Sequence, residues 1–134
     1  MITLSQNDYI GNCYEGAAIE LLGDMVSVSD ENIRDGIRDG FLVHGYPQLQ
    51  AESGGHPKGT KYGHAWVEFV ADGIEWCKDG GTGRICPKAL YYMAGKIDGS
   101  ECKRYTAQEA SRMILKHKHW GVWEEVPEGV AFKG

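Results

Sequence analysis

Residues 63–79 read GHAWVEFVADGIEWCKD, and this stretch predicts a β-hairpin. Apolar and polar side chains alternate along both halves, which is typical of strands that bury one face. Asp72-Gly73 stands between the halves, and Asp-Gly is a preferred pair at the centre of a two-residue hairpin turn. A turn on these two residues pairs Ala71 with Ile74 and so sets the register of the two strands.

The register decides which side chains share a face of the predicted sheet. One face is apolar and consists of Ala65, Val67, Phe69, Ile74 and Trp76. The other face carries His64, Trp66, Glu68, Cys77 and Asp79. We therefore expect His64 and Asp79 on one side of one sheet, as diagonal neighbours, or directly opposite each other if the turn is Ala71-Asp72. Glu68 is a poorer partner for His64, because four residues along a strand span ~13 Å.

A histidine oriented by an aspartate is part of a catalytic arrangement, and a nucleophile is expected earlier in the chain. The pattern from Asn12 to Met25 predicts a helix, with Asn12 as N-cap and Glu15 completing a capping box. Cys13 would then open the helix, where free backbone N–H groups and the helix dipole favour a thiolate. The alternative is a small buried side chain, because free cysteines are often buried.

The other elements predict an α+β domain. Strands are expected near residues 41–46 and 101–105, in addition to the hairpin strands 64–70 and 74–79. Short helices are expected from Pro87 to Ala94 and from Ala107 to Lys116, the latter opened by a capping box. Residues 48–62 predict a loop, either a lid over the site or an ordinary insertion. Two Arg-Asp-Gly triplets in residues 34–40 indicate a solvated face.

Composition restricts the class of protein. The 134 residues suit one domain, and the formal net charge of −5 without a basic block argues against nucleic acid or an anionic membrane as main partner. No apolar run is long enough for a membrane span, and the N-terminus does not have the pattern of a signal peptide. The four cysteines form no Cys-x-x-Cys pair, which favours free thiols in a reducing cytoplasm.

The ordered set of these motifs resembles the transglutaminase-like branch of the papain-like thiol superfamily. The matching residues are Cys13 at a helix start, His64-Ala65-Trp66 on a strand, and Asp79 at the end of the next strand. Tyr14 stands where the family often has a tryptophan near the cysteine. The block from residue 91 to residue 123 resembles small proteins carried by bacteriophages.

The resemblance implies a single papain-like domain over residues 1–134, with the Cys13 helix packed on an antiparallel sheet. Cys13 would attack an acyl carbon, His64 would transfer the proton, and Asp79 would hold the imidazole. Backbone N–H groups at the start of the Cys13 helix would stabilise the oxyanion. Candidate oxyanion or substrate contacts are Asn12, Gln6 and Trp66.

The implied activity is that of a cysteine hydrolase, a thiol protease or an acyltransferase without cofactor or metal. Its substrate would be an amide in a protein or peptide: a peptide bond, an isopeptide bond or a glutamine side chain. One alternative is an inactive papain-like module that binds or inhibits another protein, such as a phage protein that acts on a host protein. Another is a metal site built from His44, His56, His64 and Asp79. The sequence does not predict the oligomeric state.

Overall fold

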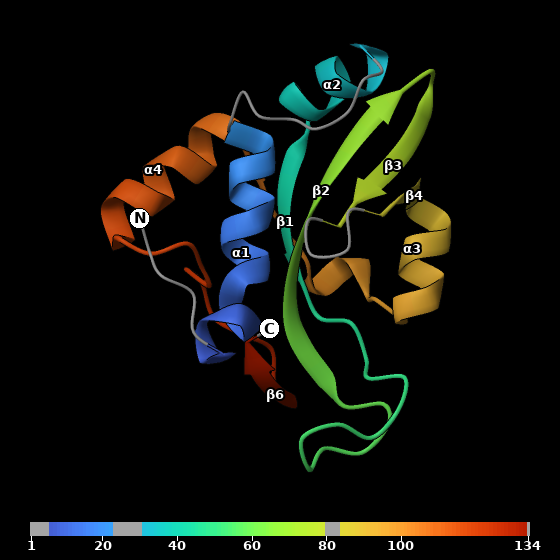
Figure 1. Cartoon of the computed structure of the whole chain (residues 1–134), viewed down its shortest axis with the longest axis vertical. Helices are drawn as coiled ribbons and strands as arrows, with labels where there is room; N and C mark the ends of the chain where they lie inside the picture. The colour runs from blue at the N-terminus through green and yellow to red at the C-terminus, as the bar shows by residue number, and fades with distance from the viewer. Residues whose placement is uncertain (1–5, 23–30, 80–83, 134) are drawn as a thin grey trace.

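The structure is a computed structural model, and it describes residues 6–22, 31–79 and 84–133. These residues form an α+β fold around an open antiparallel sheet with the strand order β4-β3-β2-β1-β5 (Figure 1). The sheet strands are β1 (Phe41–Gly45), β2 (Lys61–Ala71), β3 (Ile74–Lys78), β4 (Ile85–Pro87) and β5 (Lys103–Thr106). The helices are α1 (Gln6–Leu22), α2 (Glu31–Arg38), α3 (Lys88–Gly95), the short 3-10 helix η1 (Gly99–Glu101) and α4 (Ala107–His117). A last strand, β6 (Val130–Lys133), pairs in parallel with the start of β2.

The hairpin of β2 and β3 has the predicted register, which is confirmed. Ala71 pairs with Ile74, and the pairing continues to Val67 with Lys78. Both turn residues have positive φ, 55° at Asp72 and 75° at Gly73. Asp-Gly suits this turn because glycine pays no steric cost at positive φ and aspartate tolerates it.

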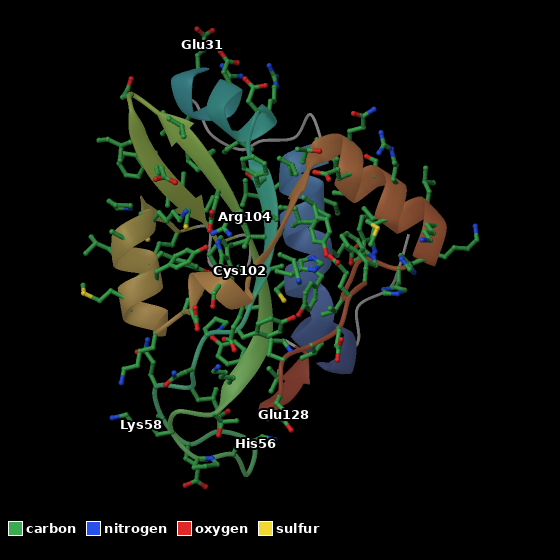
Figure 2. All side chains as sticks on the ribbon, turned by 180° about the vertical axis from the view of Figure 1, so that it is seen from behind. Glu31, His56, Lys58, Cys102, Arg104 and Glu128 are labelled. Carbon is green, nitrogen blue, oxygen red and sulfur yellow. The ribbon has the colours of Figure 1, made fainter. Side chains whose placement is uncertain are left out.

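The two faces of the sheet carry separate apolar clusters. Ala65, Val67 and Phe69 pack with residues of α1 such as Ala17 and Leu21. On the other face, Val43, Trp66 and Cys77 are buried against α3 and the segment that follows it. Figures 1 and 2 show α1 in front of the sheet in one view and behind it in the other. The alternation of residues 63–79 therefore predicted both faces correctly.

Helix α1 begins earlier than predicted. It starts at Gln6, so Asn12 is an interior residue of the helix and the predicted N-cap is wrong. No proline interrupts residues 6–12, and a capping residue is worth only ~1 kcal/mol, which is too little to force the start at residue 12. The predicted end at Met25 lies outside the described residues.

The glycines of α2 and its C-terminal turn explain the repeated Arg-Asp-Gly triplet. A Cβ added at Gly36 would lie 2.5 Å from the carbonyl oxygen of Val70, and one added at Gly40 would lie 2.4 Å from that of Glu68. Asp35, Arg38 and Asp39 are exposed, as predicted, whereas Arg34 is half-buried. The glycines let α2 approach the backbone of β2.

The loop of residues 48–62 is tied to the end of α3. The Gln50 side-chain amide donates to the carbonyl of Ala94 at 2.7 Å, and the Gln48 N–H donates to the carbonyl of Gly95 at 2.9 Å. The mobility expected of a lid stays a prediction. Within the described part of the chain, none of the helices has the length and apolar character needed to cross a membrane.

Candidate active site

His64 and Asp79 form the hydrogen bond that the hairpin register predicts. The Nε2–H of His64 donates to Oδ2 of Asp79 at 2.9 Å, and the two side chains are 17% and 13% exposed. Glu68 lies too far along the same strand and has other partners. The geometric prediction that Asp79, and not Glu68, accepts from His64 is confirmed.

Cys13 reaches the same histidine from α1. A hydrogen bond between His64 and Cys13 contributes to the raised pKa of the imidazole. Because Asp79 occupies Nε2, Nδ1 is the ring nitrogen left for the thiol. Cys13 itself is partly buried against the apolar cluster under α1. The three residues predicted as a triad therefore meet, although they come from a helix, a strand and the end of a second strand.

The site lies along an open edge of β2. β3 pairs with β2 only from Val67 onward, and β6 pairs only at Lys61 and Gly63. Among the described residues, no strand pairs with this edge from His64 to Trp66. Through this gap the Cys13 side chain on α1 is able to reach His64. The aromatic neighbours Trp66 and Tyr91 lie on the α3 side of the sheet.

The protonation of His64 is set by opposing effects. Burial by itself would lower the pKa of the imidazole, but hydrogen bonds and charge interactions with Asp79 and Cys13 outweigh it and raise the pKa to about 9. His64 is therefore protonated at neutral pH. A charged imidazole therefore lies between the Asp79 carboxylate and the Cys13 thiol.

Two tyrosines flank the histidine and its aspartate. The Tyr91 hydroxyl donates to Oδ2 of Asp79 at 2.9 Å, and the Tyr62 ring centroid lies 6.1 Å from that of His64. These hydroxyl contacts were not predicted from the sequence. Adjacent residues on a helix point about 100° apart, so a Tyr-Tyr pair is able to bond two different carboxylates.

The predicted oxyanion site is not formed by the start of α1. Cys13 is the eighth residue of the helix, and seven residues of helix span about 10 Å. The free N–H groups of the helix terminus therefore lie far from the thiol, and this expectation is wrong. Gln6 opens α1 and Asn12 precedes Cys13 on it, but both side chains lie outside the described residues.

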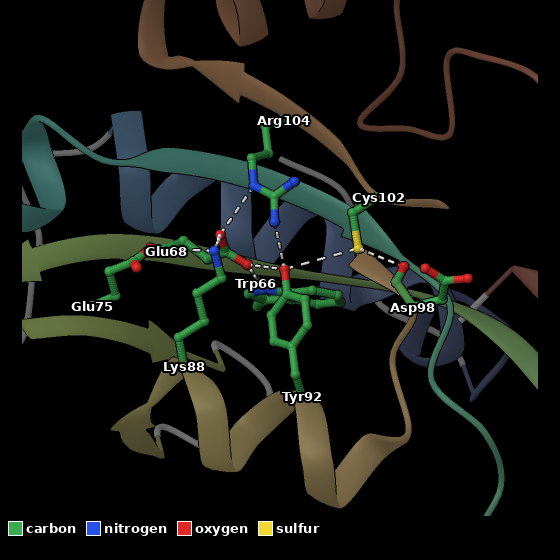
Figure 3. A network of polar contacts seen from close by, with 8 residues as sticks. All are labelled: Trp66, Glu68, Glu75, Lys88, Tyr92, Asp98, Cys102 and Arg104. Carbon is green, nitrogen blue, oxygen red and sulfur yellow. Dashed lines mark hydrogen bonds and ion pairs between the residues drawn. The ribbon is translucent and has the colours of Figure 1, made fainter. Parts of the chain in front are cut away.

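Trp66 does not contact a substrate, contrary to the prediction, because its side chain is fully buried. Its indole Nε1–H donates to Oε2 of Glu68 at 3.0 Å, and Tyr92 also donates to this oxygen. Arg104 Nε donates to the other oxygen of Glu68 at 3.1 Å, and Lys88 lies 3.4 Å from it (Figure 3). Trp66 and Glu68 thus form a buried support beneath the site.

The four residues of the metal alternative are not gathered into a cluster. His44 is 1% exposed and lies among the rings of Tyr14, Tyr105 and Trp123, at centroid distances of 4.9 to 5.2 Å. Burial lowers the pKa of His44 to about 3. Within the described part of the chain, no group of three or more histidine, cysteine or acidic residues has a metal-binding arrangement.

The environments of the other cysteines differ from that of Cys13. Cys77 is fully buried, and burial together with the charge of Glu68 raises the pKa of its thiol. Burial also raises the pKa of the Cys102 thiol. Neither thiol has a hydrogen-bonded histidine beside it among the contacts described, whereas Cys13 has His64.

Comparison of the chain with protein-family models, with curated proteins and with solved structures found no match.

Proposed function

We propose that this protein is a papain-like, transglutaminase-like cysteine enzyme that hydrolyses or transfers an acyl group from an amide. The observation that carries the proposal is His64, which is hydrogen-bonded to Asp79 on one side and to Cys13 on the other. A thiol, an imidazole and a carboxylate in this order form a nucleophile, a general base and an orienting group.

The reaction begins with the Cys13 thiolate attacking the carbonyl carbon of the amide. The C–N bond breaks as protonated His64 gives its proton to the leaving nitrogen, and a thioester remains on Cys13. His64, now neutral, takes a proton from the second nucleophile, which is water in hydrolysis or deamidation and an amine in acyl transfer. Asp79 keeps Nε2 protonated, so that Nδ1 is the nitrogen that exchanges the proton.

The oxyanion of the tetrahedral intermediate needs donors from outside the start of α1. Tyr62 and His64 are two residues apart on β2, so their side chains share a face. Burial, followed by the charges of Asp79 and Cys13, raises the pKa of Tyr62 and keeps its hydroxyl protonated as a donor. We assign the Tyr62 hydroxyl as a hydrogen-bond donor to the oxyanion.

The substrate we propose is a protein or peptide in the cytoplasm. All four cysteines are free, which is the state that a reducing cytoplasm maintains. Peptide bonds, isopeptide bonds and glutamine side chains all present the amide carbonyl that the site requires.

The first test of the proposal is selective alkylation of the native protein. Substoichiometric iodoacetamide near neutral pH, followed by peptide mapping, should label Cys13 before the other cysteines, because its histidine partner favours the thiolate. Cys77 and Cys102 serve as internal controls. Preferential labelling of any other cysteine would contradict the assignment.

The second test asks whether the thiol performs acyl chemistry. p-Nitrophenyl acetate should give a burst of nitrophenolate, close to one equivalent, as Cys13 is acylated, followed by slower turnover. Cys13→Ser should lose the burst, whereas Cys102→Ser should retain it. A folded protein without a burst would be evidence against a working nucleophile.

A second candidate function is a binding module that retains the triad without turnover. The interior position of Cys13 in α1 favours it, because the usual backbone oxyanion donors are then missing. A pocket of about 640 Å³ at the other end of β2 also favours it, since Glu68, Val70, Lys88 and Arg104 are among its lining residues and the triad is not. Absence of the ester burst, together with normal alkylation of Cys13, would support this function.

A further inference from the structure

Tyr91 contacts the candidate triad from the face of the sheet opposite α1. Its hydroxyl donates to Oδ2 of Asp79 at 2.9 Å, and the same oxygen accepts the Nε2–H of His64 at 2.9 Å. One carboxylate oxygen therefore receives two donors, one from the helix α3 and one from the strand β2.

Asp79 directly follows the last residue of β3. Its backbone N–H donates to the carbonyl of Arg84 at 2.9 Å, which fixes the main chain. A carboxylate at the end of a strand has several staggered rotamers. In the observed rotamer, Oδ2 of Asp79 meets both Tyr91 and His64.

The phenol is itself held firmly in place. The Tyr91 ring centroid lies 5.2 Å from that of Trp66, and Trp66 is fixed by its hydrogen bond to the buried Glu68. Tyr92, the next residue of α3, also donates to Glu68 (Figure 3). Two adjacent tyrosines therefore tie α3 to two carboxylates on neighbouring strands, and α3 cannot shift without breaking both contacts.

We propose that Tyr91 is a positioning residue that acts on His64 through Asp79: its hydroxyl shares the negative charge of the carboxylate. Burial and the neighbouring Asp79 raise the pKa of Tyr91, so the hydroxyl stays a donor at every pH at which the protein would work. A carboxylate that also accepts a hydrogen bond from a phenol stabilises the imidazolium less than a carboxylate without this second donor, because part of its negative charge is shared with the phenol. Tyr91 thus keeps His64 from holding its proton too tightly. The inference refines the catalytic site proposed above.

The test is a histidine titration by NMR in Tyr91→Phe, with the His64 resonance assigned by its loss in His64→Gln. Phenylalanine keeps the ring against Trp66 and removes only the hydroxyl. We expect the midpoint of the His64 titration to rise by about 0.5 pH units or more, a roughly threefold gain in proton affinity. The matched control is Tyr92→Phe, which loses a hydroxyl from the same helix but not a contact with Asp79, and it should titrate as the wild type.

Three outcomes would overturn the inference: an unchanged midpoint in Tyr91→Phe, a lower midpoint, or an equal shift in Tyr92→Phe. The last would mean that α3 acts only through packing. The titration requires no turnover, so it separates this inference from the proposed function. A shifted midpoint in a protein that gives no ester burst would leave Tyr91 as a positioning residue in a site that is not catalytic. If the burst occurs, the pH–rate profile of deacylation should move with the midpoint.

Discussion

At the scale of single residues, two histidines on neighbouring strands have opposite chemistry. His44 is opposite Ala65 in the register of β1 and β2, so its side chain points to the α1 face, whereas His64 points away from it. The rings around His44 offer no hydrogen-bond partner to either of its nitrogens among the described residues. A carboxylate and a thiol meet His64. Burial is the largest single influence on the pKa in both cases. It lowers the pKa of His44, whereas at His64 the hydrogen bonds and charge interactions with Asp79 and Cys13 together outweigh it and raise the pKa.

Asp79→Asn is the sharpest residue-scale prediction. An amide is able to orient the imidazole but favours the wrong tautomer and does not stabilise the imidazolium, so ester turnover should fall by about 10³- to 10⁴-fold. The pKa of His64 should fall from about 9 because a raising partner is lost. Turnover of p-nitrophenyl acetate and an NMR titration measure the two effects.

The matched control is Glu75→Gln on the same strand, where the side chain is exposed and pairs with Lys88 at the surface. This variant should keep wild-type turnover. The role of Asp79 would be refuted by a folded Asp79→Asn protein with wild-type turnover.

At the scale of elements, the position of α2 depends on contacts between backbones. Gly36 and Gly40 are four residues apart and so lie on one side of the helix and its C-terminal turn. Each meets a carbonyl oxygen of β2 at a distance that leaves no room for a Cβ. Gly16 in α1 differs from these two glycines, because a Cβ added there would meet no atom within 4 Å.

This contrast predicts opposite effects for the same substitution in two helices. Gly16→Ala should raise the free energy of unfolding by about 0.5–1 kcal/mol, because alanine favours helix more than glycine does. Gly36→Ala should lower it by about 1–3 kcal/mol, because the clash with the Val70 carbonyl forces α2 away from β2. Urea unfolding of the two variants measures both values. Equal stabilisation in both would mean that α2 does not pack closely on β2.

At the scale of the whole molecule, the two histidines predict a stability optimum near pH 6.5. The folded pKa of His44, about 3, lies below its ordinary value of 6.5, so stability falls as pH drops from 6.5 towards 3. The folded pKa of His64, about 9, lies above 6.5, so its contribution is complete below pH 6.5 and is lost as pH rises through 9. Each slope approaches about 1.4 kcal/mol per pH unit.

Urea unfolding at pH 5, 6.5 and 9 tests this profile. His44→Phe fills the aromatic site without a titrating group and should flatten the acid side. His64→Gln should flatten the alkaline side and leave the acid side unchanged. A free energy of unfolding that does not change between pH 6.5 and 9 in the wild type would contradict the raised pKa of His64.

The local sequence determined the hairpin, its register and the two faces of the sheet. These features depend on side-chain alternation and on a turn that only a few residues tolerate, so they are readable from neighbours in the chain. The capping box of α4, with Thr106 and Glu109, is confirmed for the same reason. The bond between His64 and Asp79 followed from the register alone. The strands β4 and β6 were missed because three or four residues carry too little periodicity.

Only the tertiary structure decided what meets His64 from outside its own hairpin. Cys13 reaches it because α1 packs across β2 beside residues 64–66, a stretch of edge with which neither β3 nor β6 pairs, and such packing depends on the whole core. The start of α1, the burial of Trp66 and the Tyr91 contact with Asp79 were decided in the same way. Periodicity reports which face of an element is buried, but the element that covers this face is set by the free energy of the complete fold.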